Sequence, residues 1–124
     1  MQQVLCIAAL GAIGCLSRYF LSGWVYKICG NAFPYGTLVV NIVGAFLIGL
    51  IMEFSMRSAL VPPVLRVAVT VGFLGGLTTF STFSLESFRL LEEGQFVVAF
   101  FNMLLSVVAC LACTWLGVAT ARSL

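Results

Sequence analysis

The 124-residue chain contains no histidine, and charged side chains make up only 8% of it, against roughly 25% in an average soluble domain. Apolar residues account for 62%. So few charges cannot coat a water-soluble particle, which argues against a soluble enzyme. Without histidine, and with only four acidic residues, the chain also lacks the usual groups for acid–base catalysis and metal ligation. The net charge of +2 gives no basic surface for nucleic acid.

The five cysteines are an odd number scattered through apolar sequence, which does not indicate a disulfide framework. Cys110 and Cys113 form a C-x-x-C, but no second pair completes a zinc site. We interpret the cysteines as small apolar side chains on membrane-embedded helices.

The long apolar segments predict an all-α membrane protein. A spanning helix needs about 20 mainly apolar residues, and four segments qualify. They cover residues 4–26, 36–54, 64–91 and 96–121, and together form a single integral membrane domain. The short connections leave no room for a soluble domain.

The basic residues are nearly balanced between the two sides of the membrane. Arg57, Arg66 and Arg122 lie on the side of the termini, and Lys27 and Arg89 lie on the other, where Arg18 would add a third charge. Since an imbalance is what fixes orientation, we expect insertion both ways up and pairing of inverted copies. The alternative is one orientation set by features that this count misses.

The third segment contains glycines and threonines that are poor helix formers in its middle. We predict a break near residues 75–79, where freed carbonyls must be buried in protein or line a cavity. Converging carbonyls can hold a hard cation such as sodium. However, Gly72 and Gly76 also form a G-x-x-x-G helix-packing groove, and the spacing does not separate the two interpretations.

After the predicted break, an aromatic stripe adjoins a hydroxyl stripe. Phe80 and Phe83 share one helical face, and Ser81 and Ser84 repeat that spacing on the neighbouring face. Ring edges and neutral donors can line the path of a small anion without trapping it. Ordinary packing phenylalanines and serines bonded to their own helix are the alternative.

Further polar residues lie in the other segments. Thr37 and Asn41 are one turn apart in the second, where the asparagine is either a pore donor or a helix–helix contact. Arg18 either reaches the membrane surface or points into a vestibule, and Glu86 either pairs with a cation or flanks the pore mouth. In the fourth segment, three more donors lie on one face: Asn102, Ser106 and Thr114.

At these residues the sequence resembles the Fluc/CrcB family of bacterial fluoride channels over essentially its full length. The matching stretches are Gly36-Thr37-Leu38-Val39-Val40-Asn41, with Gly44 and Gly49, and Gly72 through Ser84; Arg18 fits as well. The resemblance implies an antiparallel, dual-topology homodimer in the bacterial inner membrane. It would have two pores that passively export fluoride after hydrogen fluoride enters and dissociates, protecting the cell from fluoride toxicity.

The resemblance also implies residue roles. A structural sodium ion at the dimer centre would be held by the carbonyls of Gly75 and Thr78 of each subunit. The fluoride pore would be formed by Phe80 and Phe83 of both subunits, the Asn41 amide, and a polar track of Ser81, Ser84 and Thr114, with Arg18 and Glu86 near the vestibules. Cys110 stands where many relatives have a small hydroxyl residue, and Asn102 and Ser106 receive no role.

Two other functions compete with a channel. Small four-helix, dual-topology exporters of multidrug or other cations need a carboxylate in the first helix, and the first segment has none. A non-transporting assembly subunit would use the glycines for packing alone, but it leaves the paired stripes without a purpose.

Overall fold

A computed structural model describes residues 1–124 and confirms four helical segments long and apolar enough to cross a membrane. They are α1 (Gln2–Cys29), α2 (Tyr35–Arg57), a third segment from Pro63 to Glu92, and α6 (Phe96–Ser123). Most ends lie one to three residues beyond the predicted ones. Lys27 and Arg57 lie in the last turns of α1 and α2. Because a charged residue lowers the local hydropathy, hydropathy predicted the ends of these two helices before the helical hydrogen bonds stop.

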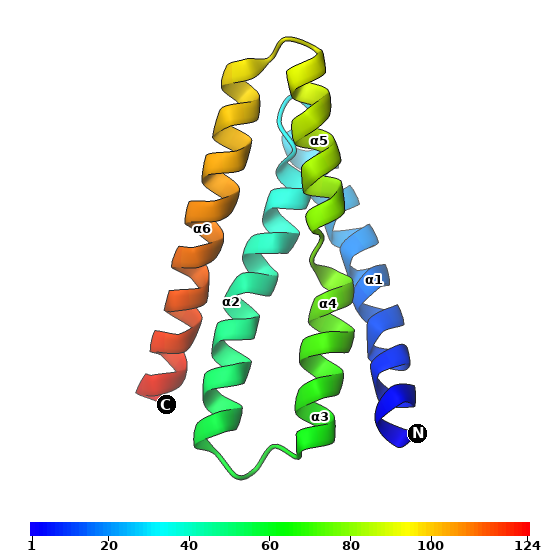
Figure 1. The fold of residues 1–124 in the computed structure, drawn as a ribbon, viewed down its shortest axis with the longest axis vertical. Coiled ribbons are helices and arrows are strands. Elements are labelled where there is room, and N and C mark those ends of the chain that lie inside the picture. The colour runs from blue at the N-terminus through cyan, green and yellow to red at the C-terminus, as the bar shows by residue number, and fades with distance from the viewer.

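Backbone geometry ends the helices in the connections. Gly30 follows α1 with φ 80°, and its N–H bonds back to the Tyr26 carbonyl. Gly94 has φ 75° in the short turn before α6. Positive φ is accessible to glycine at little steric cost, so both positions reverse the chain without strain. Figure 1 shows the resulting up-and-down arrangement, with both termini at the same end.

The third segment is not uniform. After α3 (Pro63–Val67) the helix widens into a π-helical stretch, η1 (Ala68–Leu74), and tightens again in α4 (Gly75–Leu77). Thr78 and Thr79 are extended, and α5 (Phe80–Glu92) follows. The extended backbone thus covers two residues, whereas the sequence led us to expect an interruption over 75–79. Gly75 and Gly76 remain helical despite their low propensity, because packing overrides it.

Small residues bring the helices into close contact. A Cβ on Gly72 or Gly76 would lie 2.7 Å from the Ile7 carbonyl oxygen or 2.6 Å from the Gly11 carbonyl oxygen, both on α1. A Cβ on Gly117 of α6 would overlap the Phe46 carbonyl of α2. The G-x-x-x-G pair therefore packs against α1, and the extended backbone begins two residues later.

We expect Gly76→Ala to destabilise the fold by about 1–3 kcal/mol, because the added methyl group meets backbone that cannot move aside. The measurement is thermal unfolding of the purified protein in detergent. Gly23→Ala is the matched control, since nothing lies within 4 Å of its added Cβ. Equal melting temperatures for the two variants would contradict the close α1 contact.

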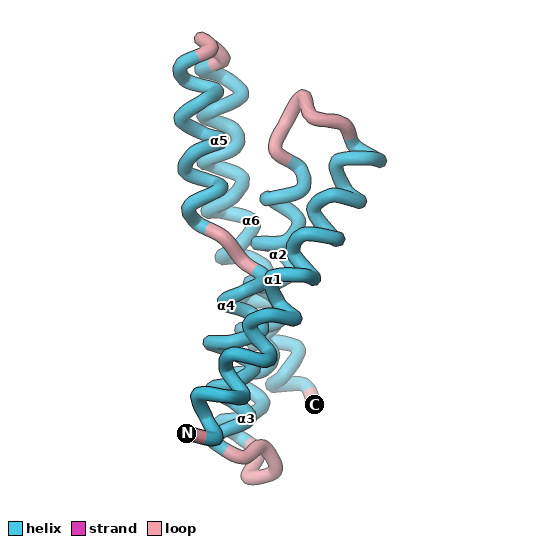
Figure 2. The backbone as a smooth tube through the Cα atoms, turned by 90° about the vertical axis from the view of Figure 1, so that its right-hand side faces the viewer, coloured by secondary structure: helices cyan, strands magenta, loops and turns pink.

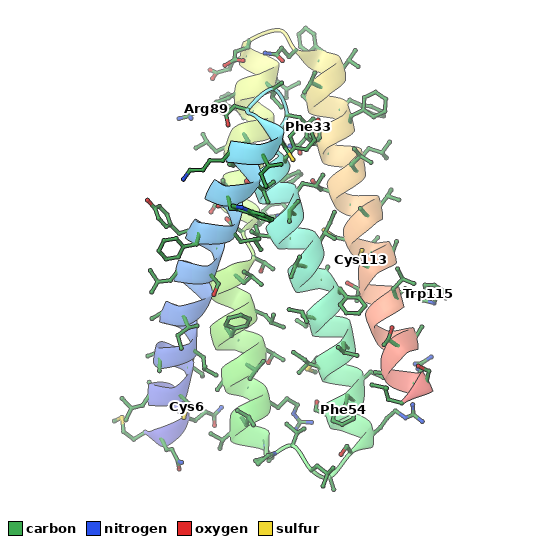
Figure 3. The ribbon with its side chains drawn as sticks, turned by 180° about the vertical axis from the view of Figure 1, so that it is seen from behind. Cys6, Phe33, Phe54, Arg89, Cys113 and Trp115 are labelled. Carbon is green, nitrogen blue, oxygen red and sulfur yellow. The ribbon has the colours of Figure 1, made fainter.

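The helices expose most of their apolar side chains. Only 20 of 124 residues are buried, and Trp115, which points away from α6 in Figure 3, is 67% exposed. In Figure 2, α5 and α6 lean away from the connection between α1 and α2. A single chain therefore leaves large apolar faces for lipid or another protein surface.

Candidate functional site

A cavity of about 420 Å³ lies between α2, the third segment and α6. Six of the predicted site residues line it: Asn41, Gly75, Thr78, Phe80, Phe83 and Thr114. No ionised side chain contributes to its wall, which combines apolar groups with neutral donors and acceptors. The predicted residues Thr37, Ser81, Ser84, Arg18 and Glu86 lie outside the lining.

Asn41 bridges α2 to the extended backbone of the third segment. Its Nδ2 donates to the Thr79 carbonyl at 3.0 Å, and its Oδ1 accepts from the Thr79 N–H at 2.8 Å. The side chain thus satisfies both backbone groups of one residue that has left the helix. A primary amide carries two N–H bonds, so one donor of Asn41 remains for the cavity.

The hydrogen bond between Thr79 and Asn41 also leaves the Gly75 carbonyl without its helical donor. In a continuous helix the Thr79 N–H would donate to Gly75, four residues back, but here it donates to Asn41. Thr78 keeps a helical bond from its N–H to the Leu74 carbonyl at 3.0 Å. The Gly75 carbonyl thereby loses its helical donor, at an exposed residue that begins α4.

The start of α5 is capped by Thr79, whose hydroxyl accepts from the Thr82 N–H at 3.2 Å. The remaining first-turn N–H groups give this end of the helix a partial positive charge. It lies in the middle of the third segment and favours an anion beside it.

The two phenylalanine rings lie together at the cavity. Their centroids are 5.4 Å apart, with an interplanar angle of 50°. Phe83 is half-buried, whereas Phe80 is 79% exposed. The rings form one aromatic border that a single chain covers on one side only.

Thr37 and Glu86 form a second polar cluster at a separate pocket. The Thr37 hydroxyl donates to Glu86 Oε1 at 2.6 Å, and the Tyr26 hydroxyl donates to Glu86 Oε2 at 3.3 Å. Glu86 and Tyr26 line a pocket of about 380 Å³ near Arg89. The carboxylate of α5 is thus held by hydroxyls of α1 and α2.

Arg18 points toward the third segment. Its Nη1 donates to the Thr78 carbonyl at 3.4 Å, so the guanidinium of α1 lies against the extended backbone. Ser81 and Ser84 are exposed, and the Ser81 hydroxyl lies 3.4 Å from the Thr79 hydroxyl.

Four polar residues that received no predicted site role also line the cavity: Thr70, Thr79, Ser106 and Cys110. Ser106, Cys110 and Thr114 lie at four-residue intervals, which places them in one row along α6. That spacing is visible in the sequence. The sequence predicts Ser106 and Thr114 on one face, and the structure adds Cys110 between them as a lining residue.

No group of three or more histidine, cysteine, aspartate or glutamate side chains could hold a metal ion. A hard cation would therefore depend on backbone carbonyls, which are the ligand type that sodium takes at interrupted membrane helices.

Comparison with known proteins gives a consistent set of relatives. Residues 5–118 match the family described as CrcB-like protein, Camphor Resistance (CrcB). The chain is 68% identical to the fluoride-specific ion channel FluC of Geobacter sp. (strain M21) and to that of Citrifermentans bemidjiense, over the full length of each protein. It is 56% identical over its full length to the fluoride-specific ion channel FluC of Geobacter sulfurreducens.

Proposed function

The chain belongs to the CrcB-like family, and from this membership we propose that it is a fluoride-specific ion channel of the membrane. A channel lets an ion pass down its gradient and changes no covalent bond, so the protein is not an enzyme. The observation that carries the proposal is the cavity lined by Phe80, Phe83 and neutral donors without any ionised side chain.

The cavity chemistry suits a small, strongly hydrated anion. Fluoride must lose water to enter, and N–H and O–H groups can replace that water. Asn41 on α2 and Ser106 on α6 supply such groups, whereas the Thr114 hydroxyl donates to the Cys110 carbonyl at 3.0 Å. The positive ring edges of Phe80 and Phe83 add weak attraction, and weak attraction allows the ion to leave again.

The conducting unit in this proposal is an antiparallel homodimer with two pores in the bacterial inner membrane. Phe80 is 79% exposed in one chain, so a pore bordered by its ring needs a second wall. A second copy can supply that wall. The nearly equal basic charge on the two sides of the chain supports insertion in both orientations.

A reporter fused to the C-terminus tests this assembly. A cytoplasmic fluorescent reporter and a periplasmic enzymatic reporter should both be active on the same chain. Activity of only one reporter would contradict the inverted homodimer while leaving the channel function untouched.

The proposal also places a structural sodium ion at the dimer centre, held by the carbonyls of Gly75 and Thr78. The Gly75 carbonyl is released from the helix, and the Thr78 carbonyl accepts only a long bond from Arg18, at 3.4 Å. Two oxygens are too few for a hard cation, but two inverted chains would supply four. The donor set therefore fits sodium.

Removing sodium should loosen the dimer. We expect exchange into N-methylglucamine buffer to lower the melting temperature or release monomer on size exclusion, because four uncompensated carbonyls would then face one another. Re-addition of sodium should restore the dimer, whereas potassium at equal ionic strength serves as the control. Identical behaviour in all three buffers would contradict a structural sodium site.

Reconstituted liposomes test the channel function itself. Liposomes loaded with fluoride should release it through the purified protein, as read by a fluoride electrode, and those loaded with chloride should not. A cation exporter would instead require a membrane carboxylate in α1, and that helix contains no acidic residue. Absence of fluoride release would refute the proposed function.

A further inference from the structure

The helix that carries the two phenylalanines is held by few contacts. α5 packs against α6 and α2 and meets α1 only through the hydrogen bond from Tyr26 to Glu86, and its first residue follows extended backbone. Apolar contacts between membrane helices leave rotation weakly defined, because lipid tails are as apolar as the side chains. Polar contacts must therefore define how α5 is rotated about its own axis.

One such contact joins α5 to α6. Asn102 Nδ2 donates to the Ser87 Oγ at 2.9 Å, and it is the only side-chain hydrogen bond between these two helices. The Ser87 hydroxyl in turn donates to the Phe83 carbonyl at 2.8 Å. Asn102 and Ser87 are only 2% and 5% exposed.

We infer that Ser87 and Asn102 are a positioning pair that sets the rotation of α5 and so aims the Phe83 ring into the cavity. This inference rests on the proposed fluoride channel. A chain of two hydrogen bonds links the amide on α6 to the backbone of the residue that carries the ring. Rotation of α5 would leave the buried amide without its acceptor, which is costly in a membrane interior.

The pair does not act by binding the ion. Neither Ser87 nor Asn102 lines the cavity, and the Asn102 Nδ2 is already directed at Ser87. Its effect on fluoride must therefore pass through the position of Phe83, which does line the cavity.

Asn102→Leu tests the inference, because leucine keeps the branched shape of asparagine and removes the donor. A lost interhelical bond of this kind shifts a positional equilibrium by about three- to tenfold, and we expect fluoride efflux to fall by a similar factor. The swapped double variant Ser87→Asn/Asn102→Ser should recover much of the lost efflux. Thr120→Val is the matched control, since its exposed hydroxyl bonds only within α6.

A second readout reports the ring itself. With 4-fluorophenylalanine at position 83, Asn102→Leu should broaden or split the ¹⁹F resonance, whereas a label at exposed Phe100 should be unchanged. An unchanged resonance at position 83, or unchanged efflux, would overturn the inference. If Asn102→Leu is not recovered folded, Ser87→Ala decides by the same two measurements. Wild-type liposomes that release no fluoride would count against the proposed function instead.

Discussion

Replacing both Phe80 and Phe83 with isoleucine should reduce fluoride efflux about 100-fold. Isoleucine is apolar and keeps the cavity wall, but it has no positively polarised ring edge. Aromatic pairs contribute about 0.5–1.5 kcal/mol beyond burial, and on the same scale two ring edges facing fluoride account for about 1–3 kcal/mol. At about 1.4 kcal/mol per tenfold change in rate, the upper end of this range corresponds to a loss of about 100-fold.

Efflux from liposomes measures the effect, and Phe88→Ile is the matched control on the same helix. Phe88 is 57% exposed and does not line the cavity, so its replacement should leave efflux at the wild-type rate. Equal efflux from the double variant and the wild type would show that the rings do not border the ion path. Because the double variant keeps every polar contact of α5, loss of folding is not the expected cause.

The four helices were predictable because membrane insertion depends on local hydropathy, which each segment carries by itself. The position of the extended residues, Thr78 and Thr79, was harder to predict. Low propensity pointed to Gly75 and Gly76, yet close packing against α1 keeps the helix through Leu77. The deciding contact is the hydrogen-bonded bridge between Asn41 and Thr79, which joins residues 38 positions apart. No local pattern contains that information.

In the candidate site, too, local spacing was predictable from the sequence and contacts between distant residues were not. Spacing placed Phe80 and Phe83 on one face, and their rings do lie together. It could not say which face of α5 meets a neighbour; in a single chain Ser81 and Ser84 are exposed and lie outside the cavity lining, and their role in a pore stays a prediction. Thr37 bonds to Glu86, 49 residues away, and only the folded chain reveals this pairing.

Asn41 provides the second large expected effect, because it combines a backbone bridge with a donor facing the cavity. Asn41→Asp keeps the shape and the acceptor for the Thr79 N–H. It removes the N–H that bonds the Thr79 carbonyl, and it adds negative charge beside the proposed anion path. A unit charge about 6 Å from fluoride, at an effective dielectric constant of about 20, opposes passage by about 3 kcal/mol.

That energy corresponds to a loss of fluoride efflux of roughly 100-fold, measured with the fluoride electrode. Gln95→Glu makes the same chemical change in the exposed connection before α6, away from the cavity, and should leave efflux within about twofold of the wild type. An equal loss of fluoride efflux in Asn41→Asp and Gln95→Glu would show that the overall charge of the protein causes the effect. Full efflux from Asn41→Asp would exclude the amide from the path, since a carboxylate beside the ion must repel it.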